Sequence, residues 1–497
     1  MISNNPIKLR MRKNQMKNQL GTNASRCTRC ICRLFMAIIC LESVFYCPWV
    51  QAEDWPTYMR DNARSGVTPE TLDLSALREA WVYRSPCPPR TAFAGAAPWD
   101  AYHDETHVND IVMTDMRDFD SALFVTVIDD SVYVGSSVTD SVHCLGLHSG
   151  EQEWAYTTDG PVRFPPSYEN GKLYFASDDG CAYCIDAADA SLEWKYTPIP
   201  ADERRRVCNN GKLIPMWPIR TGTAVEGGDV YFAASLVPWR SSYLCSVDAA
   251  AGTENYRVSG GQTPIGAILT SSTKIYLTQG RAFPSVYSRI NGGLLSNFES
   301  TGYGGGQTNI GQGNGGVYAL ITSDPTSQFI YGRGQSYCAD GHPTDSSRLK
   351  GFNASTGDHI ATFPKAVGMV VSDGKTYVLT GATLQAVTRP SGPTVWTTSG
   401  LGYSPYTLIK AGNHLFVGGK GKVVAYDSSD GSELWTRKVT GRIRGLAAAN
   451  GYLFASTDTG HVYAFGGIPY DVSRDGTVGI EDLSSFGGQY LNSTDPN

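Results

Sequence analysis

Residues 184–194 read Cys-Ile-Asp-Ala-Ala-Asp-Ala-Ser-Leu-Glu-Trp, and residues 425–435 read Ala-Tyr-Asp-Ser-Ser-Asp-Gly-Ser-Glu-Leu-Trp. In both stretches an Asp stands eight residues before a Trp. An Asp side chain accepts hydrogen bonds from backbone amides in a tight turn, and Gly adopts a positive φ at little steric cost. The pattern therefore predicts a β-hairpin whose second strand ends in a large aromatic residue, which can wedge between neighbouring sheets.

The same spacing recurs along the chain, which indicates an internal repeat. Further copies end at Trp154, Tyr256 and Trp396, and two degenerate copies end at Phe298 and at Ala361. A second hairpin precedes most copies, so that each unit has four short antiparallel strands. Because helical periodicity is nearly absent, the sequence predicts an all-β fold in which each unit is one blade of a β-propeller.

The number of blades follows from the aromatic position, which occurs seven times. An eighth unit begins near Arg442 and lacks its outer strand, while residues 77–85 around Trp81 supply a matching strand near the N-terminus. We therefore predict an eight-bladed β-propeller over residues 53–466 that the N-terminal strand closes, because closure removes exposed strand edges. Seven blades are the alternative.

The two repeat signatures and the opening residues 54–66 (Asp-Trp-Pro-Thr-Tyr-Met-Arg-Asp-Asn-Ala-Arg-Ser-Gly) resemble the PQQ-type, or quinoprotein-like, β-propeller repeat family over residues 54–466. That family includes quinoprotein alcohol dehydrogenases and non-enzymatic relatives such as outer-membrane assembly scaffolds. The resemblance implies that a dehydrogenase would place two adjacent, disulfide-bonded cysteines over its quinone. This sequence has no Cys-Cys pair, and Ile185 replaces the His that a haem-attachment motif would need after Cys184.

These absences from the sequence favour a binding or scaffold module without PQQ. Its partner would be a protein, a polysaccharide or an acidic small-molecule ligand. A PQQ-dependent dehydrogenase is the alternative, and a carbohydrate-active hydrolase is a further one.

Charge divides the chain into a basic leader and an acidic body. Residues 1–52 hold eight Lys or Arg and one acid, which leaves 33 bases and 46 acids beyond them. An acidic body repels phosphate backbones, so we expect no nucleic-acid binding. The basic stretch, the apolar residues 34–41 and the sequence Val50-Gln51-Ala52 predict a signal peptide cleaved after Ala52. The protein would be exported to the periplasm, the cell surface or the extracellular space.

A membrane anchor is the alternative interpretation of the leader, although its apolar run is too short to span a bilayer. We expect no transmembrane segment after the signal peptide.

Arginines recur where blades begin, at Arg163, Arg220 and Arg444. Three guanidinium groups around the mouth of a central channel would suit a carboxylate or sulfate ligand. Pairing with acids of the blade turns, such as Asp178 or Asp179, is the alternative.

A polar loop over residues 99–110 contains His103 and His107, four residues apart. If this loop were helical, the two imidazoles would face the same side and could bind a metal. The alternative is a solvated loop without a ligand.

The C-terminal residues 467–497 contain a second module. Residues 471–482 have the spacing of a twelve-residue calcium loop, with Gly476 at the sharp turn. The expected calcium ligands are Asp471, Ser473, Asp475, Thr477 and Asp482. Asp at position twelve, followed by Leu483, resembles a dockerin repeat. A complete dockerin has two such repeats and this chain has one, which puts a cohesin-type partner in doubt. A solvated acidic turn is the alternative.

Overall fold

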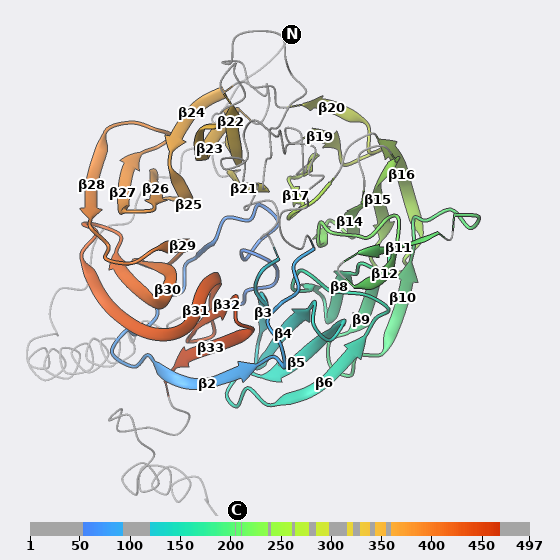
Figure 1. Cartoon of the computed structure of the whole chain (residues 1–497), viewed down its shortest axis with the longest axis horizontal. Helices are drawn as coiled ribbons and strands as arrows, with labels where there is room; N and C mark the ends of the chain where they lie inside the picture. The colour runs from blue at the N-terminus through green and yellow to red at the C-terminus, as the bar shows by residue number, and fades with distance from the viewer. Residues whose placement is uncertain are drawn as a thin grey trace, which may run out of the picture. The chain divides into compact units, whose positions relative to one another are not determined.

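The structure is a computed structural model, and Figure 1 shows the arrangement of its strands. It describes residues 53–92, 120–203, 205–209, 211–236, 240–260, 264–277, 285–297, 316–321, 329–337, 343–353 and 359–467. All of these residues belong to one unit, Ala52–Asn497. Within them the chain is all-β, and none of the described ranges contains a helix that could cross a membrane.

Most strands form four-stranded antiparallel sheets in which neighbours in the sequence are neighbours in the sheet. The first three sheets are β3 (Val125–Ile128), β4 (Ser131–Ser136), β5 (Ser141–Gly146) and β6 (Gln152–Thr157); β7 (Ser167–Glu169), β8 (Lys172–Ala176), β9 (Ala182–Asp186) and β10 (Leu192–Tyr196); and β13 (Ala224–Glu226), β14 (Asp229–Ala234), β15 (Ser242–Asp248) and β16 (Glu254–Gly260). The next three are β17 (Leu269–Thr270), β18 (Lys274–Leu277), β19 (Ser285–Ser288) and β20 (Leu294–Asn297); β21 (Gly316–Ile321), β22 (Phe329–Tyr337), β23 (Pro343–Asn353) and β24 (His359–Pro364); and β25 (Ala366–Ser372), β26 (Lys375–Thr380), β27 (Thr383–Thr388) and β28 (Thr394–Ser399). An inserted hairpin consists of β11 (Arg206–Asn209) and β12 (Lys212–Pro215).

The remaining strands form one seven-stranded sheet, because the long β31 continues from one four-stranded unit into the next. In sheet order the strands are β1 (Val67–Thr68), β29 (Pro405–Ala411), β30 (His414–Asp427), β31 (Glu433–Ala449), β32 (Tyr452–Thr457), β33 (His461–Gly466) and β2 (Arg78–Arg84). The N-terminal β2 thus pairs antiparallel with β33, with Trp81 opposite Ala464. In Figure 1, β2 lies on the outer rim beside β33.

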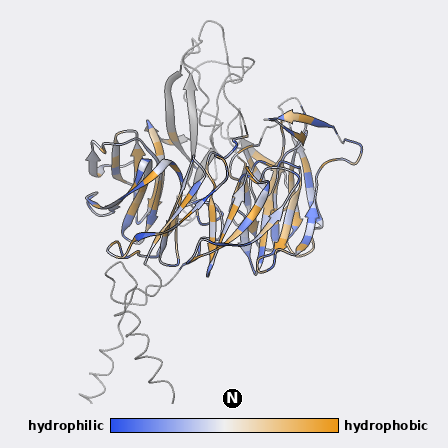
Figure 2. Ribbon diagram, turned by 60° about the horizontal axis from the view of Figure 1, so that its bottom comes forward, coloured by the Kyte–Doolittle hydropathy of each residue, from blue (hydrophilic) through white to orange (hydrophobic). Residues whose placement is uncertain are grey.

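Burial falls from the middle strands to the outer ones. The middle strand β14 is buried along almost its whole length, whereas the outer strand β10 is mostly exposed. Figure 2 shows hydrophobic and hydrophilic residues interspersed along the strands. The core therefore lies between the faces of neighbouring sheets.

The repeat aromatic joins one sheet to the next. Trp194 Nε1 on β10 donates a hydrogen bond of 2.9 Å to Ala249 O in the turn after β15. In that turn Gly252 has a φ of +66°, and a Cβ there would lie 2.5 Å from the Trp194 ring. Only Gly fits both the backbone and the close approach of the ring. Equivalent bonds join Trp81 to Leu147 O and Trp396 to Ser428 O, which confirms the predicted wedge between sheets.

Two of these joints depart from the pattern, because Trp154 Nε1 and Trp435 Nε1 have no hydrogen-bond partner among the described residues. At the first of them, Ala190 takes the Gly position with a φ of +61°. The carbonyl of Ala187, which would accept the bond from Trp154, accepts one of 3.3 Å from the Tyr133 hydroxyl instead.

The opening residues 54–70 run across the inner strands of several sheets, and Figure 1 shows their trace near the centre of the arrangement. Trp55 pairs with Val127 of β3, and Arg64 donates to Ile268 O and Thr223 O. Further along, Glu70 accepts bonds from the amides of the turn before β32. The inner strands of several sheets are thus joined by a segment that lies outside the repeats.

Candidate functional site

Two of the three predicted arginines meet at one carboxylate. Arg163 lies four residues before β7, Arg220 lies four residues before β13, and Asp178 follows β8 by two residues. Arg163 donates from Nε to Asp178 Oδ1 at 2.9 Å and from Nη2 to Oδ2 at 2.6 Å. Arg220 donates from Nε to Oδ1 at 3.1 Å and from Nη2 to Oδ2 at 2.9 Å. Asp178 therefore accepts two bidentate guanidinium groups, the strongest geometry for this pair of groups.

A second carboxylate completes this group. Arg163 Nη1 donates to Asp120 Oδ2, and the same carboxylate oxygen accepts a bond of 2.8 Å from the Ala92 amide. Arg163 also donates to the carbonyl of Arg90 at 2.8 Å. We call Asp120, Arg163, Asp178 and Arg220 the Asp178 cluster. The side chains of these four residues are at most 4% exposed, so the charges lie in the interior.

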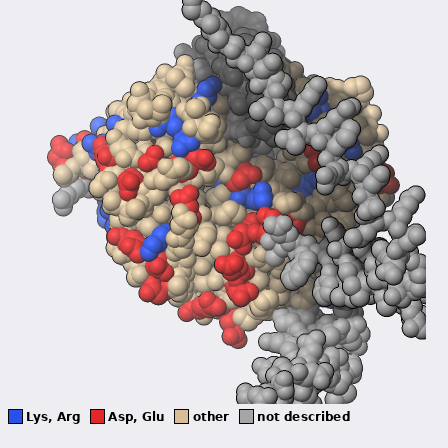
Figure 3. Space-filling model, turned by 180° about the vertical axis from the view of Figure 1, so that it is seen from behind, with Lys and Arg blue, Asp and Glu red and all other residues tan. Residues whose placement is uncertain are grey.

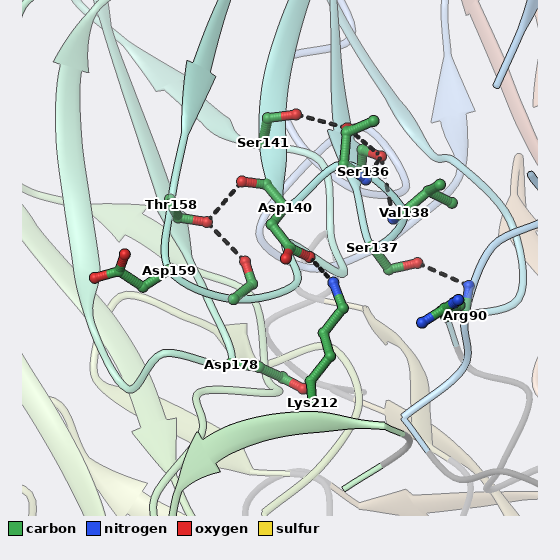
Figure 4. Close-up of polar contacts among 12 residues, drawn as sticks. Arg90, Ser136, Ser137, Val138, Asp140, Ser141, Thr158, Asp159, Asp178 and Lys212 are labelled. Atoms are coloured by element: carbon green, nitrogen blue, oxygen red, sulfur yellow. Dashed lines mark hydrogen bonds and ion pairs between the residues drawn. The ribbon is translucent and has the colours of Figure 1, made fainter. Parts of the chain in front are cut away.

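The inserted hairpin β11–β12 contacts the Asp178 cluster. Asn209 Oδ1 accepts a bond of 2.8 Å from Arg220 Nη2, and Lys212 pairs with Asp140 in the turn between β4 and β5. Figure 4 shows Lys212 reaching to Asp140, with Asp178 nearby, and the Arg90 amide bonded to Ser137. The insertion and the N-terminal stretch thus converge on the ends of the inner strands.

Electrostatics keep Asp178 ionised. Burial alone would raise the pKa of Asp178, but attraction by Arg163 and Arg220 outweighs it and lowers that pKa to about 2. Burial raises the pKa of Asp120, against the opposing attraction of Arg163. Two guanidinium groups thus face two carboxyl groups. A carboxylate or sulfate ligand would have to compete with Asp178 for both cations.

Arg444 lies in a different environment. Its guanidinium carbon lies 4.5 Å from the centre of the Tyr406 ring, a cation–π geometry. The residue also lines a small pocket with room for about one water molecule. The other lining residues are Trp55, Tyr58, Met59, Phe124, Val125, Gly445, Leu446 and Ser456. The Tyr58 ring packs edge-on against Phe124 at 4.9 Å, so the wall of this pocket is largely aromatic.

The structure thus separates the three arginines that the sequence grouped. Arg163 and Arg220 take the alternative predicted for them, pairing with Asp178, whereas Asp179 accepts a bond of 2.9 Å from the Cys181 amide. Asp120 and Asn209 were missed, because Asp120 precedes the first complete sheet and Asn209 lies in an insertion, so neither occupies a repeat position.

The other predicted sites lie outside the described residues. These are His103 and His107, the leader 1–52, and the calcium loop residues Asp471, Ser473, Asp475, Thr477 and Asp482. Among the residues that are described, no group of three or more His, Cys, Asp or Glu side chains could hold a metal ion. Figure 3 shows Asp and Glu side chains gathered in several groups on one face, which agrees with the acidic body inferred from the sequence.

Comparison with known proteins gives one matching family, described as "Outer membrane protein assembly factor BamB", over residues 94–253 and 380–476. No curated protein sequence matches the chain. Among solved structures, BamB from Moraxella catarrhalis is similar with a TM-score of 0.52 and 13% identity, covering 78% of this chain and 99% of that one.

Two enzymes are also similar in structure. Quinohemoprotein alcohol dehydrogenase from Comamonas testosteroni gives a TM-score of 0.55 and 13% identity, covering 84% of this chain and 80% of its own. A europium-containing methanol dehydrogenase gives 0.52 and 12%, covering 83% and 98%. At these identities the similarities establish a propeller-like fold and leave the activity open.

Proposed function

The chain belongs to the family described as outer membrane protein assembly factor BamB, and on that premise we propose that it is an exported β-propeller scaffold that binds other proteins. The observation that carries the proposal is the Asp178 cluster. Of the three arginines predicted to bind an anionic ligand, Arg163 and Arg220 are already paired with carboxylates of the chain itself.

This arrangement does not fit a carboxylate-bearing quinone at the Asp178 cluster. Asp178 holds a full negative charge next to Arg163 and Arg220, and that charge would repel an anionic cofactor. The absence of an adjacent cysteine pair from the sequence points the same way.

A quinoprotein oxidoreductase is the second candidate. What favours it is the similarity of the fold to a quinohemoprotein alcohol dehydrogenase and a methanol dehydrogenase. The pocket beside Arg444 has room for about one water molecule, so a quinone would have to bind elsewhere or displace the wall.

Reconstitution separates the two candidates. The purified full-length protein is incubated with PQQ and calcium, freed of unbound quinone by gel filtration, and examined by absorption spectroscopy and dye-linked alcohol oxidation. We expect neither a bound chromophore nor dye reduction. A stoichiometric chromophore that the Arg444→Gln variant fails to retain would overturn the scaffold proposal in favour of the enzyme.

We further propose that the fold has eight blades and that β2 is the outer strand of the last one. The antiparallel pairing of β2 with β33 supports this closure. Deleting residues 53–85 would then expose two strand edges, and cooperative melting should be lost. A deletion variant that melts as cooperatively as the full chain would contradict closure.

Export and calcium binding are proposals that rest on the sequence at the two ends of the chain. N-terminal sequencing of the exported protein should give Glu53 as its first residue. A calcium titration of the full-length protein should show weak binding, on the order of 10⁻⁴–10⁻³ M, because Asp482 at position twelve is one methylene shorter than the usual Glu and closes the loop less well. The Asp471→Ala plus Asp475→Ala variant should bind no calcium there. Equal heats from both proteins would mean that the loop is not a calcium site.

A further inference from the structure

Two neighbouring strands toward the C-terminal end of the chain place positive charges directly opposite one another. In the antiparallel pair β30–β31, Lys420 lies opposite Arg442, and Lys422 lies opposite Lys438. Figure 1 shows the two strands side by side. The side chains of Lys420, Lys438 and Arg442 are exposed, and that of Lys422 is half-buried. We call these four residues the basic ladder.

Opposed cations of this kind occur in no other strand pair of the described ranges. Elsewhere each Lys or Arg in a sheet faces an acidic or neutral residue, as Lys172 faces Asp186. Arg84 faces His461, and burial lowers the pKa of that imidazole, so it is neutral at pH 7. Like charges directly opposite each other destabilise a sheet. Without an anion, the basic ladder therefore opposes the pairing of β30 with β31.

The chain itself does not neutralise the basic ladder. In the part of the chain that the structure describes, no acid forms an ion pair with Lys420, Lys422 or Lys438, and Arg442 Nε lies 3.8 Å from Asp458. Lys422 Nζ lies 4.3 Å from the centre of the Tyr403 ring, a cation–π geometry that positions the ammonium group but leaves its charge. Most of the positive charge thus remains open to solvent.

The corresponding turns of three other sheets have the opposite charge. Lys420 lies where β30 turns from the second strand of its unit into the third, and the matching turns elsewhere hold Asp140, Asp178 and Asp458. Each of these acids has a cation of the chain beside it: Lys212 for Asp140, Arg163 and Arg220 for Asp178, and Arg442 for Asp458. The unit with β30 therefore reverses the charge at this position and supplies no anion of its own.

The dimensions and surroundings of the basic ladder indicate what kind of anion fits it. Opposed side chains of a strand pair begin about 5 Å apart, so one carboxylate can lie between the two cations of each pair. The two pairs are two residues apart along β30 and four along β31, because the register shifts between them. A ligand therefore needs several carboxylates within a few residues, as an extended peptide with acids at alternate positions has.

A long polyanion fits less well. Beyond residue 52 the chain has 46 acids and 33 bases, so a nucleic acid that continued past the basic ladder would meet a repelling surface. A short acidic segment interacts with the ladder alone.

We propose that the basic ladder binds a short acidic segment of a partner protein, whose Asp or Glu carboxylates lie between the opposed cations of β30 and β31. The proposal rests on the scaffold function above and names the chemistry of its partner. Binding relieves the repulsion between the cations, so the partner also stabilises the pairing of these two strands.

The test uses a labelled peptide of five Glu-Thr repeats and a neutral peptide of five Gln-Thr repeats with the same label. Binding to the full-length protein is followed by fluorescence anisotropy in about 10 mM and about 1 M salt. The ladder variant is Lys422→Gln with Lys438→Gln, which keeps the length of both side chains. The matched control is Lys195→Gln with Lys375→Gln, which removes two positive charges from other sheets. Lys195 also lies over a tyrosine ring, that of Tyr183.

We expect the wild type to bind the Glu peptide in low salt and to lose it in high salt, because screening weakens exposed ion pairs. The ladder variant should bind it at least about tenfold more weakly, and the control variant should bind it as the wild type does. The neutral peptide should not bind. In low salt and without peptide, the ladder variant should melt at a temperature no lower than that of the wild type, because it has lost one pair of opposed charges.

Three results would overturn the proposal. The first is the absence of binding of the Glu peptide by the wild type in low salt, or equal binding by the ladder variant. The second is a ladder variant that melts at a lower temperature than the wild type, since the lysines would then serve the fold. The third is binding of phosphatidylglycerol vesicles, but not of the Glu peptide, that the ladder variant loses, since a lipid headgroup would then be the occupant. The quinone reconstitution tests the scaffold function separately, and its outcome does not depend on these results.

Discussion

Asp178 and Asp458 occupy the same turn of two different sheets, and yet they have different neighbours. Each lies two residues before the Gly that closes the turn, and their amides donate to the equivalent carbonyls of Pro161 and Arg442. The Asp178 side chain is 1% exposed and accepts two bidentate guanidinium groups. Asp458 is 26% exposed and lies 3.8 Å from Arg442 Nε. The repeat thus places a carboxylate in both turns. The burial of each carboxylate determines how much its ion pair contributes to the stability of the fold.

The arginines that accompany these carboxylates differ in the same way. Arg163 and Arg220 form buried ion pairs with Asp178, whereas Arg444 lies over the Tyr406 ring and lines a pocket. Equivalent positions in a repeat protein can therefore pair with a buried carboxylate in two units and pack on an aromatic ring in a third.

The largest expected effect is at Asp178. Asp178→Ala should lower the free energy of unfolding by about 3–5 kcal/mol, because it leaves two buried guanidinium groups without their counter-ion. Asp458→Ala is the matched control and should cost less than about 1 kcal/mol, as exposed ion pairs do. Urea denaturation measures both. Equal losses would remove the distinction between the two turns.

Acid should affect the Asp178 cluster in a defined range of pH. The pKa of Asp178 is about 2 in the folded protein, below the usual value of an unfolded Asp, near 3.9. Its contribution is therefore complete above about pH 4 and is lost as the pH falls toward 2, which amounts to on the order of 2 kcal/mol.

Urea midpoints at a series of pH values between 5 and 2 measure this loss. The Asp178→Asn variant, which cannot titrate at this position, should show a flatter dependence on pH. An identical slope in both proteins would assign the acid sensitivity to other carboxylates.

Arg444 should contribute much less to stability than Asp178. Arg444→Gln removes the cation over the Tyr406 ring, and we expect a loss of about 1 kcal/mol. Thermal melting at neutral pH checks this value. A loss as large as that of Asp178→Ala would show that Arg444 is also needed for the fold.

The repeat positions were predictable from the sequence because each depends on local spacing. Asp186 and Trp194 mark a hairpin by their separation alone, and the structure has β9 and β10 there. The sequence also indicated that β2 pairs with the C-terminal strand β33. Trp81 on β2 matches the repeat aromatic, although it lies near the other end of the chain.

Contacts made by segments outside the repeats could not be predicted from the sequence. Asp120 reaches Arg163 from a stretch before the first complete sheet, and Asn209 reaches Arg220 from the inserted hairpin β11–β12. The central segment with Arg64 was recognised by resemblance, but its contacts with several inner strands follow only from the three-dimensional arrangement. The choice for Arg163 and Arg220 between a ligand and Asp178 likewise required knowing their burial.

The central claim, that the arginines beside Asp178 act as its counter-ions, is tested most directly by a double-mutant cycle. The free energies of unfolding of the wild type, Asp178→Asn, Arg220→Met and the double variant are measured by urea denaturation at pH 7. We predict a coupling energy of at least about 1.5 kcal/mol, because the two side chains share two buried, charged hydrogen bonds. Additive effects, with a coupling energy within about 0.5 kcal/mol of zero, would contradict the account and free Arg220 for a ligand.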